Sequence, residues 1–241
     1  MSSSHAYLHR RPLGHGKSNS TDAPVKTRDA ATMIVWRNGP KGTEVLMGRR
    51  GRRAAFLPNF FVFPGGRIDP ADHIIRAATP LDSAVINRMG VRRNAALALA
   101  LAITAVRETF EETGLLLAEN GDIGAVEHDA WDYWKTRGLT PALHRLSYFG
   151  RAITSPISPI RFHARFFIAR AEGLHGQLGG SGELSELGFY PVAEVLARMP
   201  IVDVTEFMLK RVTGYAAAPD YFKSGTPVFS YKNEVPLIRY E

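Results

Sequence analysis

The chain has 241 residues, of which 45% are apolar and 22% are charged, the proportions of an ordinary folded domain. No apolar run approaches the roughly 20 residues needed to span a membrane, so we expect no membrane partner. The sequence contains no cysteine, which excludes disulfides, thiol catalysis and thiolate metal sites. This composition fits the reducing cytoplasm, where we expect the protein to lie.

The positive charge is concentrated toward the N-terminus. The chain carries a net charge of +7, while residues 1–53 alone hold eleven Lys and Arg against three Asp and Glu, a surplus of eight. A basic segment of this kind suits either nucleic acid or a small phosphate-bearing molecule. Because the segment lacks a pattern of aromatic residues interleaved with the basic ones, we favour the small anionic molecule over a nucleic-acid partner.

Residues 1–28 are rich in serine, histidine, glycine and basic residues, and they show no hydrophobic periodicity. We expect a flexible basic extension over this range, because it has too few apolar side chains to bury. It also lacks the apolar stretch of a secretory signal. Residues 29–241 show neither an internal repeat nor a linker, so we expect them to form a single domain.

Three apolar segments then lead toward a pair of glycines. Residues 31–36 and 44–47 predict two strands around a turn, and residues 60–63 predict a third strand. The third strand runs into Gly65 and Gly66, where the absence of side chains lets a ligand approach the backbone. Arginines crowd the connection that precedes this strand: Arg49, Arg50, Arg52 and Arg53.

A long helix is predicted over residues 95–112, with Asn94 as its N-cap and Gly114 as its C-cap. Apolar side chains recur along it at helical spacing, which predicts that one side of the helix is buried. We expect this stripe to pack against the sheet; it consists of Leu99, Ile103, Val106 and Phe110.

Three glutamates, Glu108, Glu111 and Glu112, share the opposite face of this helix because they are spaced by three and four residues. Like charges so close together repel each other, and at the C-terminal end they also oppose the helix dipole. A solvated acidic helix end is therefore the poorer explanation. Together with the glycine pair, which lets a backbone carbonyl come close, the glutamates predict an oxygen-rich site for a hard divalent metal of the kind that acts on phosphates.

The rest of the chain alternates between strands and helices. We expect a helical excursion over residues 119–147, in which Trp131, Tyr133 and Trp134 form a packed aromatic cluster. The remaining elements are expected in this order: strand 115–117, strand 161–169, strand 189–191, helix 192–198 and helix 204–214.

Two stretches, Phe63-Pro64-Gly65-Gly66 and residues 107–115 (RETFEETGL), resemble the two halves of the Nudix hydrolase signature. That signature is written G-x5-E-x7-R-E-U-x-E-E-x-G-U, with U a bulky aliphatic residue. Gly66 and the right half fit, except that Thr109 takes the first aliphatic place. Asp72 stands where the signature has Glu.

The signature is interrupted in this chain. Between Asp72 and Arg107 lie 34 residues in place of seven, an insertion of 27. The inserted segment spans about residues 70–93 and has a helical pattern near residues 82–89. Long connections inside compact domains are usually functional or disordered, so we expect a lid or side wall over the substrate cleft.

The resemblance implies a Nudix-type α/β/α sandwich with a mixed, curved sheet, and an enzyme that hydrolyses diphosphate linkages with Mg²⁺ or Mn²⁺. It implies that Gly65, Glu111 and Glu112 bind the metal. Glu108 would be a further ligand or the base that activates water, and Arg107 would orient the cluster. A last metal ligand is expected from residues 177–186, and Glu186 is favoured over Glu183 because it lies nearer the following strand. Phe63 and Gly66 are expected to contact the substrate.

Within the superfamily, the chain most resembles the acyl-CoA diphosphatase branch, because of the insertion, the arginines before the glycines and the segment over residues 161–167. The branch implies a small nucleotide-type substrate, with coenzyme A or acyl-CoA first and ADP-ribose or a dinucleotide as the alternative. The phosphates would be read by Arg49, Arg50 or Arg53. The chain departs from this branch at residues 47–51, where MGRRG replaces its Thr-x-Arg-Ser-Ala run.

A rival from another class is a non-catalytic Nudix-like module that senses a ligand or binds RNA. Such proteins commonly lose signature glutamates, whereas this chain keeps Glu108, Glu111 and Glu112. The enzyme is therefore the favoured hypothesis. A homodimer is left open.

Overall fold

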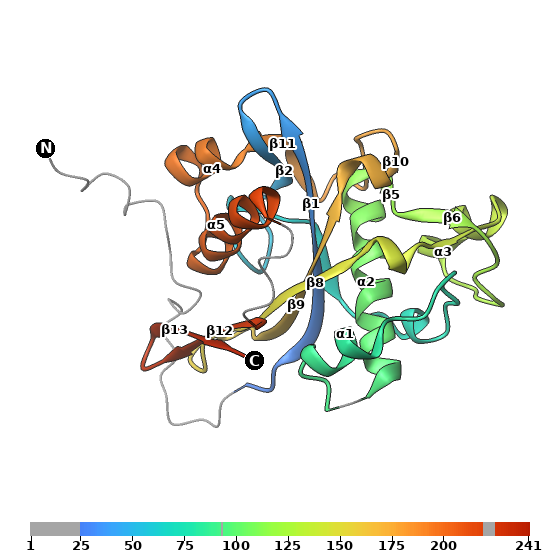
Figure 1. Cartoon of the computed structure of the whole chain (residues 1–241), viewed down its shortest axis with the longest axis horizontal. Helices are drawn as coiled ribbons and strands as arrows, with labels where there is room; N and C mark the ends of the chain where they lie inside the picture. Colours follow the sequence, from blue (N-terminus) through green and yellow to red (C-terminus); the bar gives the residue numbers. More distant parts are fainter. Residues whose placement is uncertain (1–24, 93, 219–224) are drawn as a thin grey trace, which may run out of the picture.

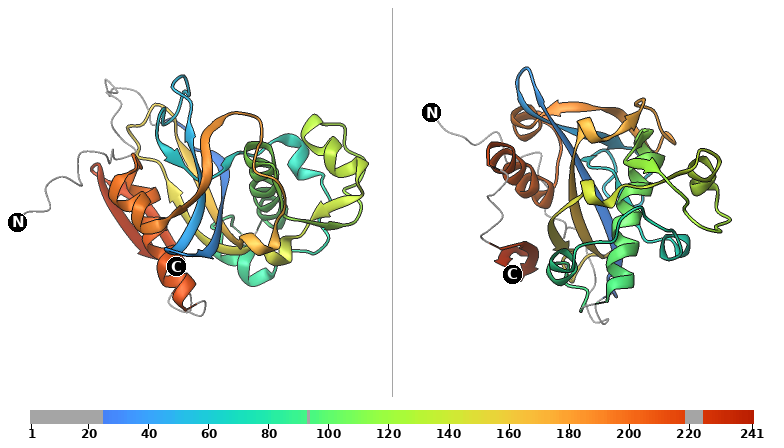
Figure 2. Two further views of the ribbon diagram at one scale, coloured as in Figure 1. Left: turned by 90° about the horizontal axis from the view of Figure 1, so that it is seen from above. Right: turned by 45° about the vertical axis from the view of Figure 1, so that its right-hand side comes forward.

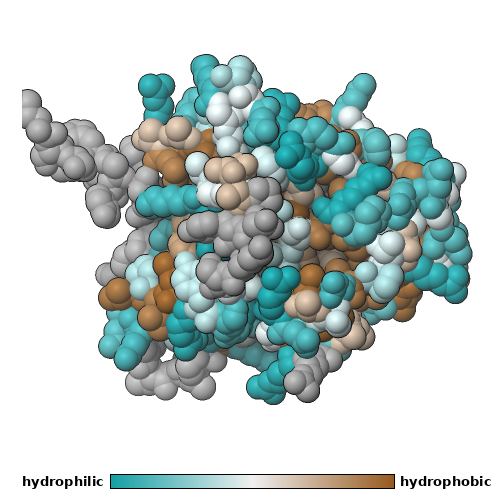
Figure 3. All heavy atoms as spheres, in the orientation of Figure 1, coloured by the Kyte–Doolittle hydropathy of each residue, from teal (hydrophilic) through white to brown (hydrophobic). Residues whose placement is uncertain are grey.

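The computed structural model describes residues 25–92, 94–218 and 225–241. The basic extension expected over residues 1–28 lies outside the described residues except at its last four positions. Within the described ranges, no helix is both long enough and apolar enough to cross a membrane. Figure 3 shows a largely hydrophilic surface on which apolar residues emerge in small groups.

A nine-stranded mixed sheet lies between two layers of helices (Figures 1 and 2). Along the sheet the order is β11, β2, β1, β9, β8, β12, β13, with β3 beside β2 and β4 beside β1. The strands are β1 (Arg28–Gly39), β2 (Gly42–Arg50), β3 (Phe61–Val62), β4 (Gly65–Arg67), β8 (Ser147–Ile153), β9 (Phe162–Arg170), β11 (Leu184–Pro191), β12 (Pro227–Lys232) and β13 (Val235–Tyr240).

Strand β1 is the centre of the sheet. It runs parallel to β9 and antiparallel to β2 and β4. Its side chains alternate between two buried faces, as successive residues of a strand must. Met33 and Val35 join the core under helix α2 (Ala95–Thr113), while Ile34 and Trp36 join the core that α4 and α5 cover. Both faces are covered, which explains why the strand is apolar throughout.

The helices divide between the two faces, as Figure 1 shows. Helices α1, α2 and α3 lie on one side of the sheet, and α4 and α5 lie on the other. The expected α/β/α sandwich is therefore confirmed. The bounds of the remaining elements are α1 (Ser83–Arg88), α3 (Asp129–Thr136), α4 (Val192–Arg198), α5 (Asp203–Ala217), the 3-10 turns η2 (Pro70–His73), η3 (Leu143–Arg145) and η4 (Ala171–Gly173), and two small sheets, β5 (Leu115–Leu116) with β10 (His175–Gly176) and β6 (Ala118–Asn120) with β7 (Leu139–Pro141).

Helix α2 begins and ends where its capping residues predict. The Asn94 side chain accepts a hydrogen bond from the Leu97 N–H at 3.0 Å, and Gly114 adopts the left-handed conformation with φ 74°. The apolar stripe differs from expectation at Phe110, whose ring contacts Tyr133 and Trp134 of α3 in place of the sheet. Because α3 covers the outer side of α2, the helix is buried on more than one face.

Two other regions differ from expectation. Residues 119–147 are helical only over α3, because β6 and β7 pair on either side of it and Gly138, at φ 59°, ends the helix. The hairpin of β12 and β13 is not predicted at all. Its turn places Asn233 and Glu234 at φ 49° and 65°, a conformation that sequences usually signal with Asn-Gly.

The inserted segment is built into the core. Ile75, Met89 and Val91 are buried in the cluster under α2, and the Met89 carbonyl accepts a hydrogen bond from the Arg165 Nε at 3.2 Å. Arg165 itself is 2% exposed and also donates to the Asp29 carboxylate. The far end of the insertion is thereby attached to the central strands, and its beginning lies beside the glycine pair.

Candidate active site

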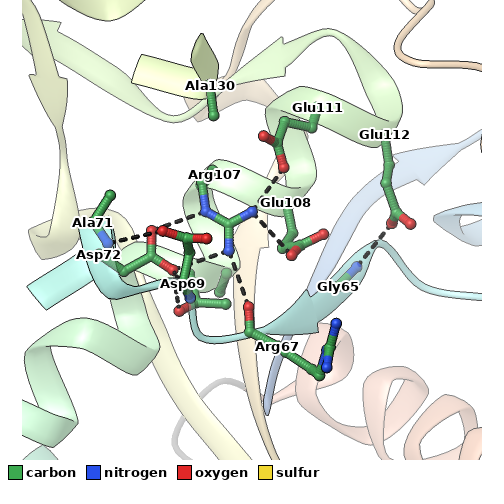
Figure 4. Close-up of polar contacts among 12 residues, drawn as sticks. Gly65, Arg67, Asp69, Ala71, Asp72, Arg107, Glu108, Glu111, Glu112 and Ala130 are labelled. Atoms are coloured by element: carbon green, nitrogen blue, oxygen red, sulfur yellow. Dashed lines mark hydrogen bonds and ion pairs between the residues drawn. The ribbon is translucent and has the colours of Figure 1, made fainter. Parts of the chain in front are cut away.

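The glycine pair in β4 brings the backbone against the carboxylates of α2. The Gly65 N–H donates to Glu112 Oε2 at 2.9 Å (Figure 4). A β-carbon at Gly65 would lie 2.5 Å from the Ala31 carbonyl oxygen, and one at Gly66 would lie 2.3 Å from Glu108 Oε1. Gly65 has no room for a side chain because the backbone of β1 blocks it, whereas a side chain at Gly66 would displace the Glu108 carboxylate from its present position. The two glycines therefore allow β4 to pair with β1 and to touch the glutamates at once.

Arg107 lies at the middle of the cluster and is 5% exposed. Its Nε and Nη2 donate to the two carboxylate oxygens of Asp72 at 2.8 and 2.9 Å. Its Nη1 donates to Glu108 Oε1 at 3.0 Å and to Glu111 Oε2 at 2.7 Å, and Nη2 also donates to the Arg67 carbonyl at 3.0 Å. All five N–H donors of a guanidinium are thereby used. The resemblance implies that Arg107 orients the carboxylates, and these hydrogen bonds would allow it to do so.

Asp72 is a site residue to which the sequence assigned no role. It is fully buried, and besides Arg107 its Oδ2 accepts from the Thr104 hydroxyl at 2.8 Å and from the Asp69 N–H at 2.9 Å. The last contact belongs to the cap of η2. The available signal was its position six residues after Gly66, where the signature has Glu. The two halves of the signature meet in space because the insertion leaves the site after Asp72.

The carboxylates of α2 are short of positive charge. Burial raises the pKa of Glu108 to about 7, although the charge of Arg107 opposes this shift. Burial likewise raises the pKa of Glu112 to about 8, against the hydrogen bond from Gly65. Both shifts show that burying these anions costs free energy that their present partners do not fully offset. A divalent cation would supply the missing charge.

Glu108, Glu111 and Glu112 offer only carboxylate oxygens as ligands. Hard divalent metals prefer oxygen ligands, so this set fits such a metal. In the part of the chain that the structure describes, no three acidic or histidine side chains already converge as a metal site. The reason is visible in Figure 4: Glu108 and Glu111 turn toward Arg107, whereas Glu112 turns toward Gly65.

A cavity of about 420 Å³ opens directly from these glutamates. We call it the main cavity. Its charged lining residues are Glu108, Glu111, Glu112 and Glu183 with Arg50 and Arg67. Much of the remaining lining is apolar or aromatic and includes Phe63, Phe166, Val204 and Phe229. A ligand in this cavity would meet both charged groups and hydrocarbon.

The glycine-rich loop before β11 rests on the C-terminal end of α2. The Gly179 N–H donates to the Thr113 carbonyl at 2.9 Å, and the Ser181 N–H donates to the Glu111 carbonyl at 2.7 Å. These bonds satisfy carbonyls that a helix end leaves without partners. They also place Glu183, two residues after Ser181, in the wall of the main cavity.

Glu186, the residue favoured from the sequence as the last metal ligand, lies elsewhere. It sits at a bulge in β11 with φ 50°, and its Oε1 accepts from Arg49 Nη1 at 2.9 Å. The geometry thus favours Glu183 over Glu186. The physical reason is the bulge between Ser185 and Gly188, which changes the direction of the Glu186 side chain and cannot be read from spacing.

Only some of the predicted substrate-binding residues lie at the main cavity. Phe63, Gly66 and Arg50 line the main cavity. Arg49 is engaged by Glu186, and Arg53 is exposed and is not among the residues that line the cavity. Of the three predicted phosphate-reading arginines, the structure brings only Arg50 to the carboxylates within the residues it describes.

Replacing Asp72 with Asn should destabilise the protein strongly. The change leaves the buried Arg107 guanidinium without its full counter-charge, so we expect a loss of about 3–5 kcal/mol in the free energy of unfolding. Asp122→Asn is the matched control, because it breaks the exposed ion pair between Asp122 and Arg76 and should cost less than about 1 kcal/mol. Urea denaturation measures both. Equal losses would show that the Arg107 network carries no special stability.

Without divalent metal, the free energy of unfolding should fall as the pH rises from about 6.5 to about 8.5. The folded-state pKa values of Glu108 (about 7) and Glu112 (about 8) lie above the ordinary 4.5. Their contribution is therefore complete below about pH 4.5 and is lost progressively as the pH rises from there to the folded values, above which no more is lost. Burial lowers the pKa of His163 to about 3. Its contribution to the free energy of unfolding therefore changes with pH only below about 6.5, outside this window.

The measurement for this pH dependence is urea denaturation with a chelator present, at several pH values, on the wild type and on Glu112→Gln. The amide keeps an acceptor for the Gly65 N–H but does not titrate, so the decline should be shallower in the variant. A decline of the same steepness in both proteins would place the titrating group outside the glutamate cluster.

Comparison with known proteins bears on the fold and the family of this chain. No family model matches the sequence. A crystal structure of a NUDIX hydrolase from Alicyclobacillus acidocaldarius has 31% sequence identity and a TM-score of 0.60, and the match covers 79% of this chain and 92% of that one. The Caenorhabditis elegans protein named "Putative nudix hydrolase 7" is 39% identical over 95 residues, which are 39% of this chain.

This chain spans about a quarter (24%) of the length of that curated relative. The match to the Alicyclobacillus structure, by contrast, extends over nearly all of it, at an identity that goes beyond a shared fold. That similarity includes the layered sheet and helices described above. The chain belongs to the Nudix hydrolase family.

Proposed function

We propose that this protein is a metal-dependent hydrolase that cleaves a diphosphate linkage in a small nucleotide-type molecule. The observation that carries the proposal is the placement of Glu108, Glu111 and Glu112 at the mouth of a cavity large enough for part of such a molecule. A partly buried cluster of carboxylates beside a ligand-sized cavity is more useful to a catalyst than to the stability of the fold. Family membership supports the same reaction.

Mg²⁺ or Mn²⁺ would be held by Glu111, Glu112 and the Gly65 carbonyl, with Glu183 as a further ligand, and would supply positive charge to the phosphoryl oxygens. Glu108 is the candidate base, because a carboxylate with a raised pKa takes a proton from water more readily than an ordinary one. Arg107 fixes Glu108 and Glu111 through hydrogen bonds of 3.0 and 2.7 Å.

Coenzyme A or acyl-CoA is the substrate that the main cavity supports best. Much of its wall is formed by hydrocarbon and aromatic rings, which suit a long group with few charges such as pantetheine or its acyl ester. Arg50 lines this cavity together with the glutamates, where a diphosphate would lie. ADP-ribose and dinucleotides would place a ribose or a second nucleoside against the same apolar lining, and they are the alternative.

The proposed activity is tested by incubating the purified protein with coenzyme A, acyl-CoA, dephospho-CoA, ADP-ribose, NADH and diadenosine polyphosphates. Each is tried with Mg²⁺, with Mn²⁺ and with a chelator, and the products are identified by mass. Glu112→Gln should lower kcat by about a hundredfold or more while the protein stays folded. Glu127→Gln, at an exposed glutamate away from the lining of the cavity, is the control and should leave kcat unchanged. Hydrolysis that survives the chelator would contradict the proposal.

Replacing Arg50 with Ala should reduce kcat/KM for every diphosphate substrate about ten- to a hundredfold. Within the described residues its Nε is buried and has no hydrogen-bond partner, which leaves a donor available to a phosphate. Arg53→Ala removes the same charge from an exposed position and should change kcat/KM less than about threefold, an effect that salt removes. Steady-state kinetics at two ionic strengths separates the two outcomes. Equal losses of kcat/KM in both variants would show that Arg50 acts only as part of a general basic surface.

A further inference from the structure

A second cavity, of about 640 Å³, lies next to the glutamate cluster at the edge of β4. We call it the basic cavity. Its charged and titratable lining residues are Arg28, Asp29, Arg67, Asp69, His73, Arg107 and Glu108. Two of these, Arg67 and Glu108, also line the main cavity. The name refers to the side chains that have no partner within the described residues, because the three arginines and three carboxylates balance in formal charge.

The acidic residues around the basic cavity are already engaged. Asp29 accepts from Arg165, and Glu108 accepts from Arg107. Asp69 accepts from the Ala71 N–H at 2.8 Å as the cap of η2, and its carboxylate lies 3.5 Å from His128 Nε2. Their charges are thus partly or wholly offset by groups that belong to the protein.

Three of the basic residues of this cavity, in contrast, have side chains without a protein partner among the described residues. Over residues 25–92, 94–218 and 225–241, the side chains of Arg28, Arg67 and His73 have no hydrogen bond or ion pair. All three are exposed to solvent. Figure 4 shows that the Arg67 carbonyl faces Arg107 while its guanidinium points away from that network. Two unpaired guanidinium groups and an imidazole in one hollow form a surplus of donors, which is a chemistry that selects anions.

The insertion gives the basic cavity one of its walls. Pro70 and His73 belong to η2, at the start of the inserted segment, and Arg28 and Arg67 come from the paired strands β1 and β4. Arg67 is opposite Ala30 in this pairing, so the two arginines emerge from neighbouring positions at the same edge. Asp72, in the same turn, is fixed by Arg107, which holds this wall in place beside the site.

We propose that the basic cavity binds a phosphate monoester group that the substrate carries in addition to its scissile diphosphate. The inference rests on the proposed function, since it assumes that the diphosphate lies at Glu108, Glu111 and Glu112. The substrate then spans both cavities, with its apolar arm in the main cavity and its phosphorylated nucleoside in the basic cavity. Coenzyme A, with pantetheine on one side of the diphosphate and a 3′-phosphate on the other, has this distribution of groups. Arg28 and His73 are specificity-determining residues, and Arg50 serves the diphosphate.

The binding experiment uses adenosine 3′,5′-bisphosphate and AMP, which differ only by the 3′-phosphate, and isothermal titration calorimetry on the full chain. We expect the wild type to prefer the bisphosphate by about tenfold or more, because charge-assisted contacts to phosphate are worth at least that much. Arg28→Ala should reduce the preference to less than about threefold, and Arg28→Lys should keep most of it. Arg53→Ala is the control of equal charge and should keep the full preference.

The kinetic experiment compares kcat/KM for coenzyme A and dephospho-CoA. Arg28→Ala and His73→Ala should lower the ratio between the two substrates, whereas Arg50→Ala should lower both values together and leave the ratio unchanged. Loss of all hydrolysis in the wild type would refute the proposed function, yet the binding experiment would still decide the role of the cavity. A wild type without preference for the bisphosphate, or an undiminished preference in Arg28→Ala, would overturn the proposal.

Discussion

The guanidinium of Arg107 ties together parts of the chain that are far apart in sequence. Its partners are Asp72 at the start of the insertion, the Arg67 carbonyl in β4, and Glu108 and Glu111 on its own helix. A buried cation that lost these partners would cost several kcal/mol, so the fold can bury Arg107 only if strand, turn and helix arrive together. The positions of the Asp72, Glu108 and Glu111 carboxylates depend on this condition.

The same arrangement prepares the cluster for a cation. Glu112 is buried and Glu108 is partly buried near the negative end of the helix dipole, and the loop that carries Glu183 adds a further carboxylate by resting on the last carbonyls of α2. One guanidinium shared by Asp72, Glu108 and Glu111 does not balance this charge. The glycines of β4 keep the approach open, because a side chain at Gly65 would collide with the backbone of β1 and one at Gly66 would displace the Glu108 carboxylate. Packing and charge thus favour the same kind of ligand.

The surroundings of the cluster come from both layers of the sandwich. The sheet, α5 and β12 supply the apolar wall of the main cavity through residues such as Phe166, Val204 and Phe229, which are separated by long stretches of sequence. The free edge of β4 and the beginning of the insertion supply the basic cavity. The insertion therefore has two parts: its buried residues extend the core under α2, and its first turn shapes a surface beside the reacting groups.

Local rules were enough to predict helix α2 with its two caps, the strands that lead to the glycines, and three glutamates on one helix face, because backbone geometry fixes the spacing of neighbours. The α/β/α fold was expected from a different signal, the resemblance of residues 63–66 and 107–115 to the Nudix signature. Local rules could not choose between Glu183 and Glu186, foresee that Phe110 meets α3, or reveal the Asp72 contact across 34 intervening residues. The first outcome depends on the bulge in β11 and the second on helix α3, which covers α2. The third depends on the path of the insertion, which brings α2 back beside Asp72. The sequence by itself determined which chemical groups the site contains. Only the tertiary structure decided which of them meet, since a contact between distant residues depends on how all the elements pack.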